Sequence, residues 1–274
     1  MGLPSYILPI MGKSIYDADA QAFITAAGIT DAIQQRAITV FVLALKSASI
    51  WTKFVAIYPM VGGTATTHKY NLKNPLDTNA AFRLSFLGGW THSSNGALPN
   101  GTNGYADTFI VPNTVMSANS AHLSYYSRTN SAILNDIPMG VGLNLGGTGL
   151  NLVVRTNTNL NSFRATEAAT AGGLVNSTSS DSRGLTSGSI TASNSRKIYK
   201  NGSLLATNSS TINWARSTGK IFLGAVNISD LATAGFFTDK ECAFASIGSG
   251  LSDAEAATLY TLVQSFETSL SRNV

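Results

Sequence analysis

Residues 197–207, KIYKNGSLLAT, carry the clearest fold signal in the chain. Asn201 and Gly202 stand between two short runs rich in apolar residues. Both residue types adopt positive φ at low cost, and a two-residue type I′ turn requires positive φ at both central positions. The segment therefore predicts a β-hairpin whose turn is Asn201-Gly202.

Similar short runs extend around this hairpin, from about residue 61 to residue 248. Apolar and polar residues alternate clearly over residues 82–86 and 150–154. Further runs are TFIVP, HLSYYSR, MGVGLNL, GKIFLGAV and ECAFASIG, with Gly, Asn and Ser clusters between them. Many short strands at regular spacing, separated by turn residues, predict a β-sandwich or a barrel.

A helical pattern precedes the β region, over about residues 14–60. Asp17 can cap a helix that Gly28 ends, and Asp31 followed by Gln34 resembles a capping box. The second helix should bury one apolar stripe, since its apolar residues recur at helical spacing. The stripe consists of Ile33, Ala37, Val40, Phe41, Ala44 and Leu45.

A second helical pattern closes the chain, over residues 252–270. Ser252 is the expected cap, and Glu255, three residues later, completes a capping box. Leu259, Val263, Phe266 and Leu270 form its buried stripe.

From residue 197 onward, the order of features resembles the laminin-G-like, concanavalin A-like jelly-roll family. The hairpin KIYKNGSLLAT, the strand KIFLGAV, the late strand CAFASIG and a helix opened by LSDAE follow in that order. The resemblance implies a mainly β, jelly-roll β-sandwich over residues 61–274, closed by the helix at 252–270. Residues 1–60 would then be a helical segment that packs on the sandwich or on a partner.

The N-terminal part resembles a family of tailed-phage virion proteins, common in phages of Bacteroidota and including crAss-like phages. The resemblance lies in YDADAQAFITAAGI, IYPMVGGTATTHKYNLKNP and FRLSFLGGWTHSSNGALPNGTNGYADT. It implies a structural protein of the particle exterior, assembled in the host cytoplasm with other virion proteins, and a homo-oligomer.

The composition argues against two classes of binding partner for this chain, nucleic acids and membranes. Charged residues make up only 12% of the 274 residues, about half the usual share of roughly 25%. The net charge is +4, but the 18 basic residues are scattered, whereas a nucleic-acid site needs them clustered. No apolar run approaches the roughly 20 residues of a membrane span, and the start, MGLPSYILPIMGKS, lacks the charged region of a signal peptide. We therefore expect neither nucleic acid nor a membrane as partner.

Little in the sequence points to catalysis. A retaining glycosidase needs two carboxyl groups about 5–5.5 Å apart, and the Glu-x-Asp-x-Glu strand motif of glycosidases with a concanavalin A-like sandwich is absent. Asp239 and Glu241 could share a strand face, but no acid precedes them at that spacing. His68, His92 and His122 form no local zinc motif. The single cysteine, Cys242, is expected to be buried and inert.

Residues 88–110, GGWTHSSNGALPNGTNGYADTFI, are the best candidate for a ligand site. Lectin-type sites on sandwiches combine Asn, Asp and Gly of loops with an aromatic ring that stacks on a sugar. Asp107 would also suit a hard cation such as calcium. The alternative is structural, because Asn-Gly pairs form turns and a Trp at a strand end commonly packs in the core. The candidate residues are Trp90, His92, Asn95, Asn100, Asn103, Tyr105 and Asp107.

These observations predict a non-enzymatic virion structural protein, an exterior fibre or decoration subunit with a lectin-like β-sandwich. A receptor-binding module for host surface glycans is the alternative, and a glycan-degrading enzyme comes third. No catalytic residue and no cofactor is expected, apart from calcium at Asp107.

Overall fold

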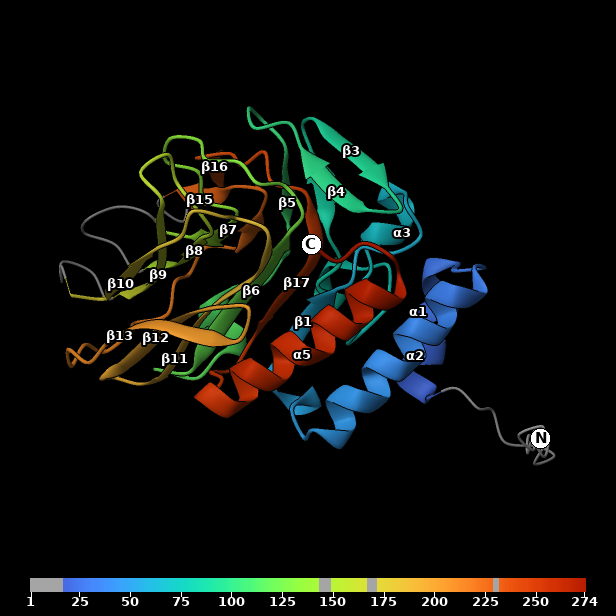
Figure 1. Ribbon diagram of the computed structural model, residues 1–274, viewed down its shortest axis with the longest axis horizontal. Coiled ribbons are helices and arrows are strands. Elements are labelled where there is room, and N and C mark those ends of the chain that lie inside the picture. Colours follow the sequence, from blue (N-terminus) through green and yellow to red (C-terminus); the bar gives the residue numbers. More distant parts are fainter. Residues whose placement is uncertain (1–16, 143–148, 167–171, 229–231) are drawn as a thin grey trace, which may run out of the picture.

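In the computed structural model, two β-sheets pack face to face and three helices cover the outer face of one sheet (Figure 1). The structure describes residues 17–142, 149–166, 172–228 and 232–274. This part of the chain is a mainly β, jelly-roll sandwich, as the sequence predicts. In its sheets every strand pairing is antiparallel except that of β15 with β7.

The first sheet has eight strands, in the order β13-β12-β11-β6-β17-β4-β3, and β1 also pairs with β17. Its strands are β1 (Phe54–Tyr58), β3 (Trp90–Ser93), β4 (Gly96–Pro99), β6 (Ala121–Ser127), β11 (Gly184–Ala192), β12 (Ser195–Lys200), β13 (Ser203–Asn208) and β17 (Cys242–Gly248). β12 and β13 form the predicted hairpin. Asn201 has φ 48° and Gly202 has φ 75°, so the turn prediction is confirmed.

The second sheet has nine strands, in the order β10-β9-β8-β7-β14-β5-β2, with β15 and β16 beside β7. Its strands are β2 (Ser85–Leu87), β5 (Tyr105–Asp107), β7 (Met139–Val141), β8 (Gly149–Val153), β9 (Leu160–Thr166), β10 (Leu174–Thr178), β14 (Phe222–Leu223), β15 (Val226–Ile228) and β16 (Thr233–Gly235). Short strands of this kind give each sheet alternating inner and outer side chains.

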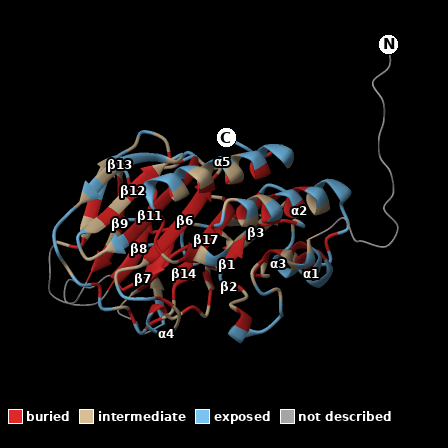
Figure 2. Cartoon of the chain, turned by 90° about the horizontal axis from the view of Figure 1, so that it is seen from below, coloured by how far each residue is buried: buried red, intermediate tan, exposed pale blue. Residues whose placement is uncertain are grey.

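The main hydrophobic core lies between the two sheets, where Figure 2 shows mostly buried residues. Leu123 of β6 and Phe163 of β9 are fully buried there. Gly188 of β11 faces Phe163, and a Cβ atom at Gly188 would lie 2.0 Å from the Phe163 ring. Glycine at this position therefore lets the Phe163 ring pack directly on the opposite sheet.

A second core lies between the first sheet and the helices α1 (Ala18–Ala27), α2 (Ala32–Ser47) and α5 (Asp253–Ser269). The Phe41 ring of α2 lies 5.7 Å from the Phe244 ring of β17 and 4.9 Å from the Phe266 ring of α5. Tyr126 of β6 and Leu259 of α5 are buried in the same cluster. Four shorter elements complete the described chain: η1 (Trp51–Lys53), α3 (Ala65–His68), η2 (Asn79–Ala81) and α4 (Pro112–Val115).

The predicted helix signals are largely confirmed. The Asp17 side chain accepts a hydrogen bond from the backbone of Asp19, and Gly28 ends α1 in the left-handed conformation. Ser252 and Glu255 form the complete capping box of α5. At α2 only half of a box forms, because the Gln34 side chain accepts from the Gly62 N–H instead.

Two details of the N-terminal prediction are wrong. Residues 54–58 are not helical but form β1, because this run of aromatic and β-branched residues pairs with β17. The apolar stripe of α2 is only partly buried, since 63% of Ile33 and 54% of Val40 is exposed. Residues 14–16 of the predicted helical segment lie outside the described residues.

The C-terminal residues fasten α5 to the sandwich through Arg272. Its buried guanidinium donates to the backbone oxygens of Pro59, Met60 and Ala243, and pairs with the buried carboxylate of Glu267. Burial raises the pKa of Glu267, and the charge of Arg272 opposes that rise. The pair therefore depends on both members, because either charge alone would be buried without a partner.

Candidate functional site

Trp90 begins β3, and its ring packs against the rings of Phe86 and His92. Its indole N–H donates to the backbone oxygens of Leu87 and Tyr105, each at 3.1 Å. The ring is half-buried against the main core, and a Cβ atom at Gly224 would lie 2.7 Å from it. Trp90 therefore fastens the start of β3 to β5.

Asn100 and Asn103 hold the loop between β4 and β5 together. The Asn100 side-chain oxygen accepts hydrogen bonds from the backbone N–H groups of Thr102, Asn103 and Gly104, each at 3.0 Å. The Asn103 side-chain oxygen accepts from the Gly89 N–H and from the Asn100 amide. These bonds use the oxygens that a ligand would otherwise contact, so the geometry favours a structural role for both residues.

His92 of β3 bonds to His68 of α3, and its ring also packs on the rings of Phe86 and Trp90. The Gly63 N–H donates to Nε2 of His68, so Nδ1 of His68 carries the proton and donates to Nδ1 of His92 at 2.9 Å. Burial lowers the pKa of His68 to about 3 and also lowers that of His92. The two rings are therefore neutral near pH 7 and act as a hydrogen-bonded pair.

Asn95 lies at the tip of the β3–β4 hairpin and is exposed. Its backbone N–H donates to the Ser93 hydroxyl. Of the seven candidates, Asn95 is thus separated from the group that contains Trp90, Tyr105 and Asp107.

Tyr105 and Asp107 lie on one outward face of β5, because Ala106 between them points into the main core. The centre of the Tyr105 ring lies 4.8 Å from the centre of the Phe222 ring, which is buried. It lies 6.5 Å from the centre of the Phe237 ring. Tyr105 and Phe237 remain partly exposed. The structure thus places an aromatic surface on the outer side of the nine-stranded sheet.

A charged pair adjoins this aromatic surface. Nζ of Lys220 lies 2.8 Å from a carboxylate oxygen of Asp107, and 40% of the Lys220 side chain is exposed. The same ammonium group lies 4.7 Å from the centre of the Phe109 ring. We call Tyr105, Asp107, Phe109, Lys220 and Phe237 the β5 face.

The sequence gives no local signal for Lys220 or Phe237 at this surface. Lys220 is separated from Asp107 by 113 positions in the chain. Lys220 reaches the β5 face because β14, which begins two residues later, pairs with β5. Phe237 lies outside the strands, and the next residue, Thr238, donates its N–H to the Gly224 backbone oxygen just after β14.

The geometry at Asp107 does not favour calcium. One carboxylate oxygen accepts from the Phe109 N–H at 2.7 Å, and the other faces the Lys220 ammonium group. A lysine thus occupies the side from which a cation would approach. Among the described residues, no group of three or more acids, histidines or cysteines is arranged to hold a metal ion.

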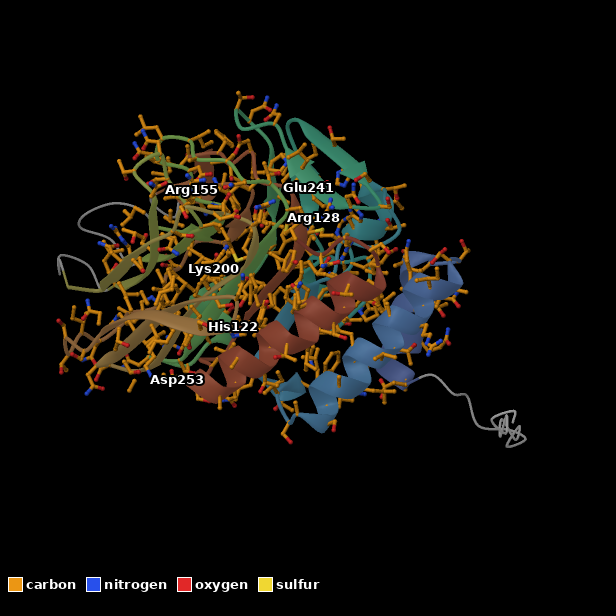
Figure 3. All side chains as sticks on the ribbon, in the orientation of Figure 1. His122, Arg128, Arg155, Lys200, Glu241 and Asp253 are labelled. Carbon is orange, nitrogen blue, oxygen red and sulfur yellow. The ribbon has the colours of Figure 1, made fainter. Side chains whose placement is uncertain are left out.

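Asp239 and Glu241, the two acids of the catalytic alternative, bond to structural partners. The Ser131 hydroxyl donates to Asp239. Glu241 pairs with Arg128 at 2.9 Å, and the two lie close together in Figure 3. Cys242 is buried, and burial raises the pKa of its thiol, as expected for an inert cysteine.

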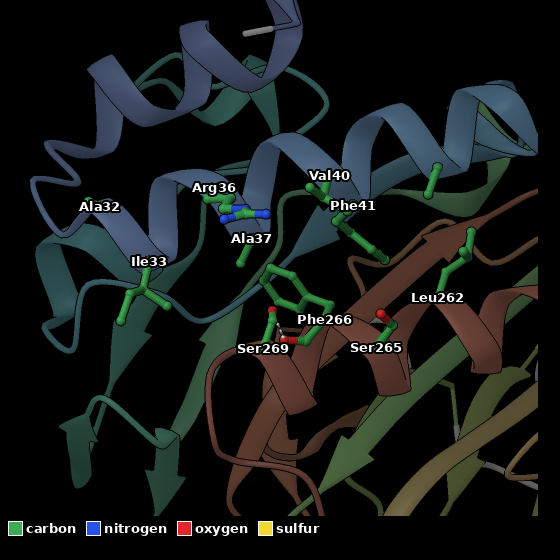
Figure 4. A pocket seen from close by; sticks show the side chains of 11 residues that line it. Ala32, Ile33, Arg36, Ala37, Val40, Phe41, Leu262, Ser265, Phe266 and Ser269 are labelled. Carbon is green, nitrogen blue, oxygen red and sulfur yellow. Dashed lines mark hydrogen bonds between the residues drawn. The ribbon is translucent and has the colours of Figure 1, made fainter. Parts of the chain in front are cut away.

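A separate surface feature is an apolar groove of about 610 Å³ between α2 and α5 (Figure 4). The exposed side chains of Ile33 and Val40 line it, together with Leu262 and Phe266 of the opposite helix. Arg36 contributes the charged group at its rim. We call this surface the α2–α5 groove. Within the described part of the chain, no helix is both long and apolar enough to span a bilayer.

The fold resembles those of solved binding domains of bacterial neurotoxins. The botulinum neurotoxin serotype D binding domain matches with a TM-score of 0.52 and 10% sequence identity, over 78% of this chain and 52% of that chain. A botulinum neurotoxin type C structure matches with a TM-score of 0.51 and 14% identity, over 80% of this chain and 53% of that chain.

This similarity concerns the fold alone. The chain spans about half the length of the solved structures that it matches. No protein-family model and no curated protein matches the sequence. The chain is therefore a jelly-roll sandwich similar in fold to these binding domains.

Proposed function

We propose that the chain is a non-enzymatic, glycan-binding module and that the β5 face contacts the sugar. The observation that carries the proposal is the position of Tyr105 beside the Asp107–Lys220 pair on an outward sheet surface. An aromatic ring can stack on the apolar face of a sugar, while the Lys220 ammonium group, whose side chain is 40% exposed, donates directional hydrogen bonds to its hydroxyl groups. The β5 face offers both kinds of contact, because Tyr105 and the Asp107–Lys220 pair lie on the same side of β5.

The structural neighbours support this proposal by analogy. Botulinum neurotoxin type C depends on interaction with two ganglioside molecules to enter cells. Gangliosides carry sugar chains, so a sandwich of this architecture can present a glycan-binding surface. The residues of the β5 face are argued from this chain alone, because fold similarity does not transfer a binding site.

Binding to an array of bacterial surface glycans tests the proposal. The unaltered chain should give saturable binding to at least one glycan, and Tyr105→Ala should weaken it at least about tenfold, equivalent to about 1.4 kcal/mol. Lys220→Gln should weaken the same binding while leaving the aromatic rings in place. Asn95→Ala is the matched control, since Asn95 is exposed at the hairpin tip, and it should bind normally. Absence of glycan binding, or equal binding by Tyr105→Ala, contradicts the proposal.

A second function rests on the α2–α5 groove and on the sequence resemblance to phage virion proteins. We infer that the module is part of a phage particle, made in the host cytoplasm and exposed as an exterior fibre or decoration subunit. The exposed apolar side chains of Ile33 and Val40 in this groove suit packing against another subunit, including a further copy of the chain. Peptides of this chain should then be recovered from purified particles of the phage that encodes it, and their absence contradicts the virion role.

The non-enzymatic part of the proposal is tested by turnover. Asp239 and Glu241 are engaged by Ser131 and Arg128, which supports a structural role for both acids. Incubation with the glycans that bind should release no smaller sugar product. Formation of any product would instead support a glycan-degrading enzyme. If Glu241→Gln then formed no product, Glu241 would be identified as the catalytic acid.

A further inference from the structure

Asp136 and Lys240 form an ion pair inside the sandwich. Both side chains are completely buried, and Nζ of Lys240 directly contacts Oδ2 of Asp136. Asp136 lies just before β7 of the second sheet, and Lys240 lies just before β17 of the first sheet. The contact therefore joins the two sheets of the sandwich. Glu241, which follows Lys240, marks this region in Figure 3.

The surroundings of the pair exclude water and orient its groups. The buried Thr238 hydroxyl donates to Oδ2 of Asp136 at 2.9 Å, so Oδ2 has two neighbours. Within the described part of the chain, Oδ1 of Asp136 has no hydrogen-bond partner. The Tyr125 hydroxyl donates to the backbone oxygen of Lys240 at 2.5 Å and fixes the backbone at that residue.

Such a pair differs from a surface salt bridge in its chemistry. In water, an amine and a carboxylic acid remain ionised, and ionised groups do not condense. Burial favours neutral forms, and burial is the main cause that raises the pKa of Asp136, opposed by the charge of Lys240. Transfer of one proton from the Lys240 ammonium group to the carboxylate that it contacts gives an amine held against a carboxylic acid. The two groups are then placed for intramolecular reaction, because folding has already brought them together.

We propose that Asp136 and Lys240 are joined by an intramolecular isopeptide bond. Nζ of Lys240 forms a bond to Cγ of Asp136, and the bond from Cγ to Oδ2 breaks. Oδ2 leaves as water with the proton of the carboxylic acid and one proton of the amine. Oδ1 becomes the oxygen of the new amide, whose nitrogen keeps one proton. Thr238 donates to the oxygen that departs, so its hydroxyl is a positioning group for the step.

The other ion pairs of the chain supply a natural comparison. The Arg272–Glu267 pair is also buried, but a guanidinium is not a nucleophile under these conditions. The Lys197–Asp253 pair has the right groups, but 55% of the Asp253 side chain is exposed. Hydrogen bonds from Lys197 and Tyr199 lower the pKa of Asp253, which keeps it ionised. Asp136–Lys240 combines a lysine, a carboxyl group and complete burial.

Intact mass spectrometry of the unaltered protein under denaturing conditions tests the inference. The expected mass is lower than the sequence mass by one water molecule. Trypsin should then fail to cut after Lys240, and a branched product should join residues 129–155 to residues 221–272. Recovery of free residues 221–240 at the full yield, with an intact mass equal to that of the sequence, overturns the proposal.

Variants separate the isopeptide bond from other losses of water, such as succinimide formation at another aspartate. Lys240→Arg and Asp136→Ala should each show the full mass of their own sequence. Asp136→Asn should still be joined to Lys240 but should lose ammonia instead of water. A loss of water that persists in Lys240→Arg contradicts the assignment to this pair. Because the main measurement uses the unaltered chain, it does not depend on whether any variant folds.

Discussion

The two faces of the eight-stranded sheet are covered in different ways. The inner face packs on the second sheet, and side chains such as Leu123 and Phe163 are completely buried between them. The outer face is covered by α1, α2 and α5, and the α2–α5 groove leaves Ile33 and Val40 exposed (Figures 2 and 4). Alternating side chains of two sheets can interdigitate along their whole length, whereas separate helices cover a sheet as individual cylinders. The inner interface is thus closely packed, whereas the outer layer leaves apolar side chains exposed.

The largest expected effect belongs to the inner interface. Phe163→Ala should lower the free energy of unfolding by about 3–5 kcal/mol, because it removes a completely buried ring and leaves a cavity against Gly188. Urea denaturation of both proteins measures the difference. A loss below about 1 kcal/mol would mean that the two sheets collapse around the vacancy and that the interface is not tightly packed.

Arg272→Met tests how firmly the helical layer is held. The variant leaves the Glu267 carboxylate buried without its partner and removes the donor to four backbone oxygens, so we expect a loss of about 3–5 kcal/mol. Thermal unfolding followed by circular dichroism reports it. The double variant Arg272→Met with Glu267→Leu is the control and should recover part of the loss, because no unpaired charge remains. If the double variant is as unstable as the single one, packing rather than charge explains the effect.

Acidification should weaken the outer layer through His122. Nδ1 of this buried ring donates to the Ser249 backbone oxygen, and Nε2 accepts from the Ser246 hydroxyl. Burial lowers its pKa from 6.5 to about 4, while Lys53 also lowers it and Glu255 raises it. Between these values the unfolded chain binds more protons than the folded chain, so stability falls as pH falls from about 6.5 to 4, by roughly 3 kcal/mol.

Urea denaturation at several pH values measures that slope. His122→Gln is the control, and its stability should depend less on pH in the same window. Because the pKa of His68 is also lowered, to about 3, the His122→Gln variant should keep part of the pH dependence of stability. A His122→Gln variant with an unchanged slope would assign the effect to His68 or to acidic groups.

The smallest change in stability is expected for the exposed residues of the α2–α5 groove. Ile33→Ser and Val40→Ser should alter the free energy of unfolding by less than about 0.5 kcal/mol, because both side chains are more than half exposed. If the groove packs against another copy of the chain, the same variants should shift light-scattering mass toward the monomer. Large destabilisation without any change in association would show that these residues support the fold alone.

For residues 88–110, the sequence predicts the turns but not the surroundings of the side chains. The Asn-Gly pairs predict turns, and Asn100 does organise a tight loop through three backbone N–H groups. The seven candidates, however, face different groups in the fold. His92 pairs with His68, Asn95 lies at a hairpin tip, and Tyr105 and Asp107 face outward beside Lys220. Sequence proximity could not separate these directions, because they depend on the face of each strand.

Features that depend on neighbouring residues can be read directly from the sequence. Asn201-Gly202 fixes a hairpin through positive φ, and Ser252 with Glu255 begins α5 by satisfying free backbone N–H groups. That residues 54–58 become a strand follows from tertiary packing, because their partner β17 lies almost 200 positions away. Tertiary packing also brought Lys220 to Asp107 and Lys240 to Asp136. These contacts depend on sheet register and on the packing of two sheets, which no local pattern of residues encodes.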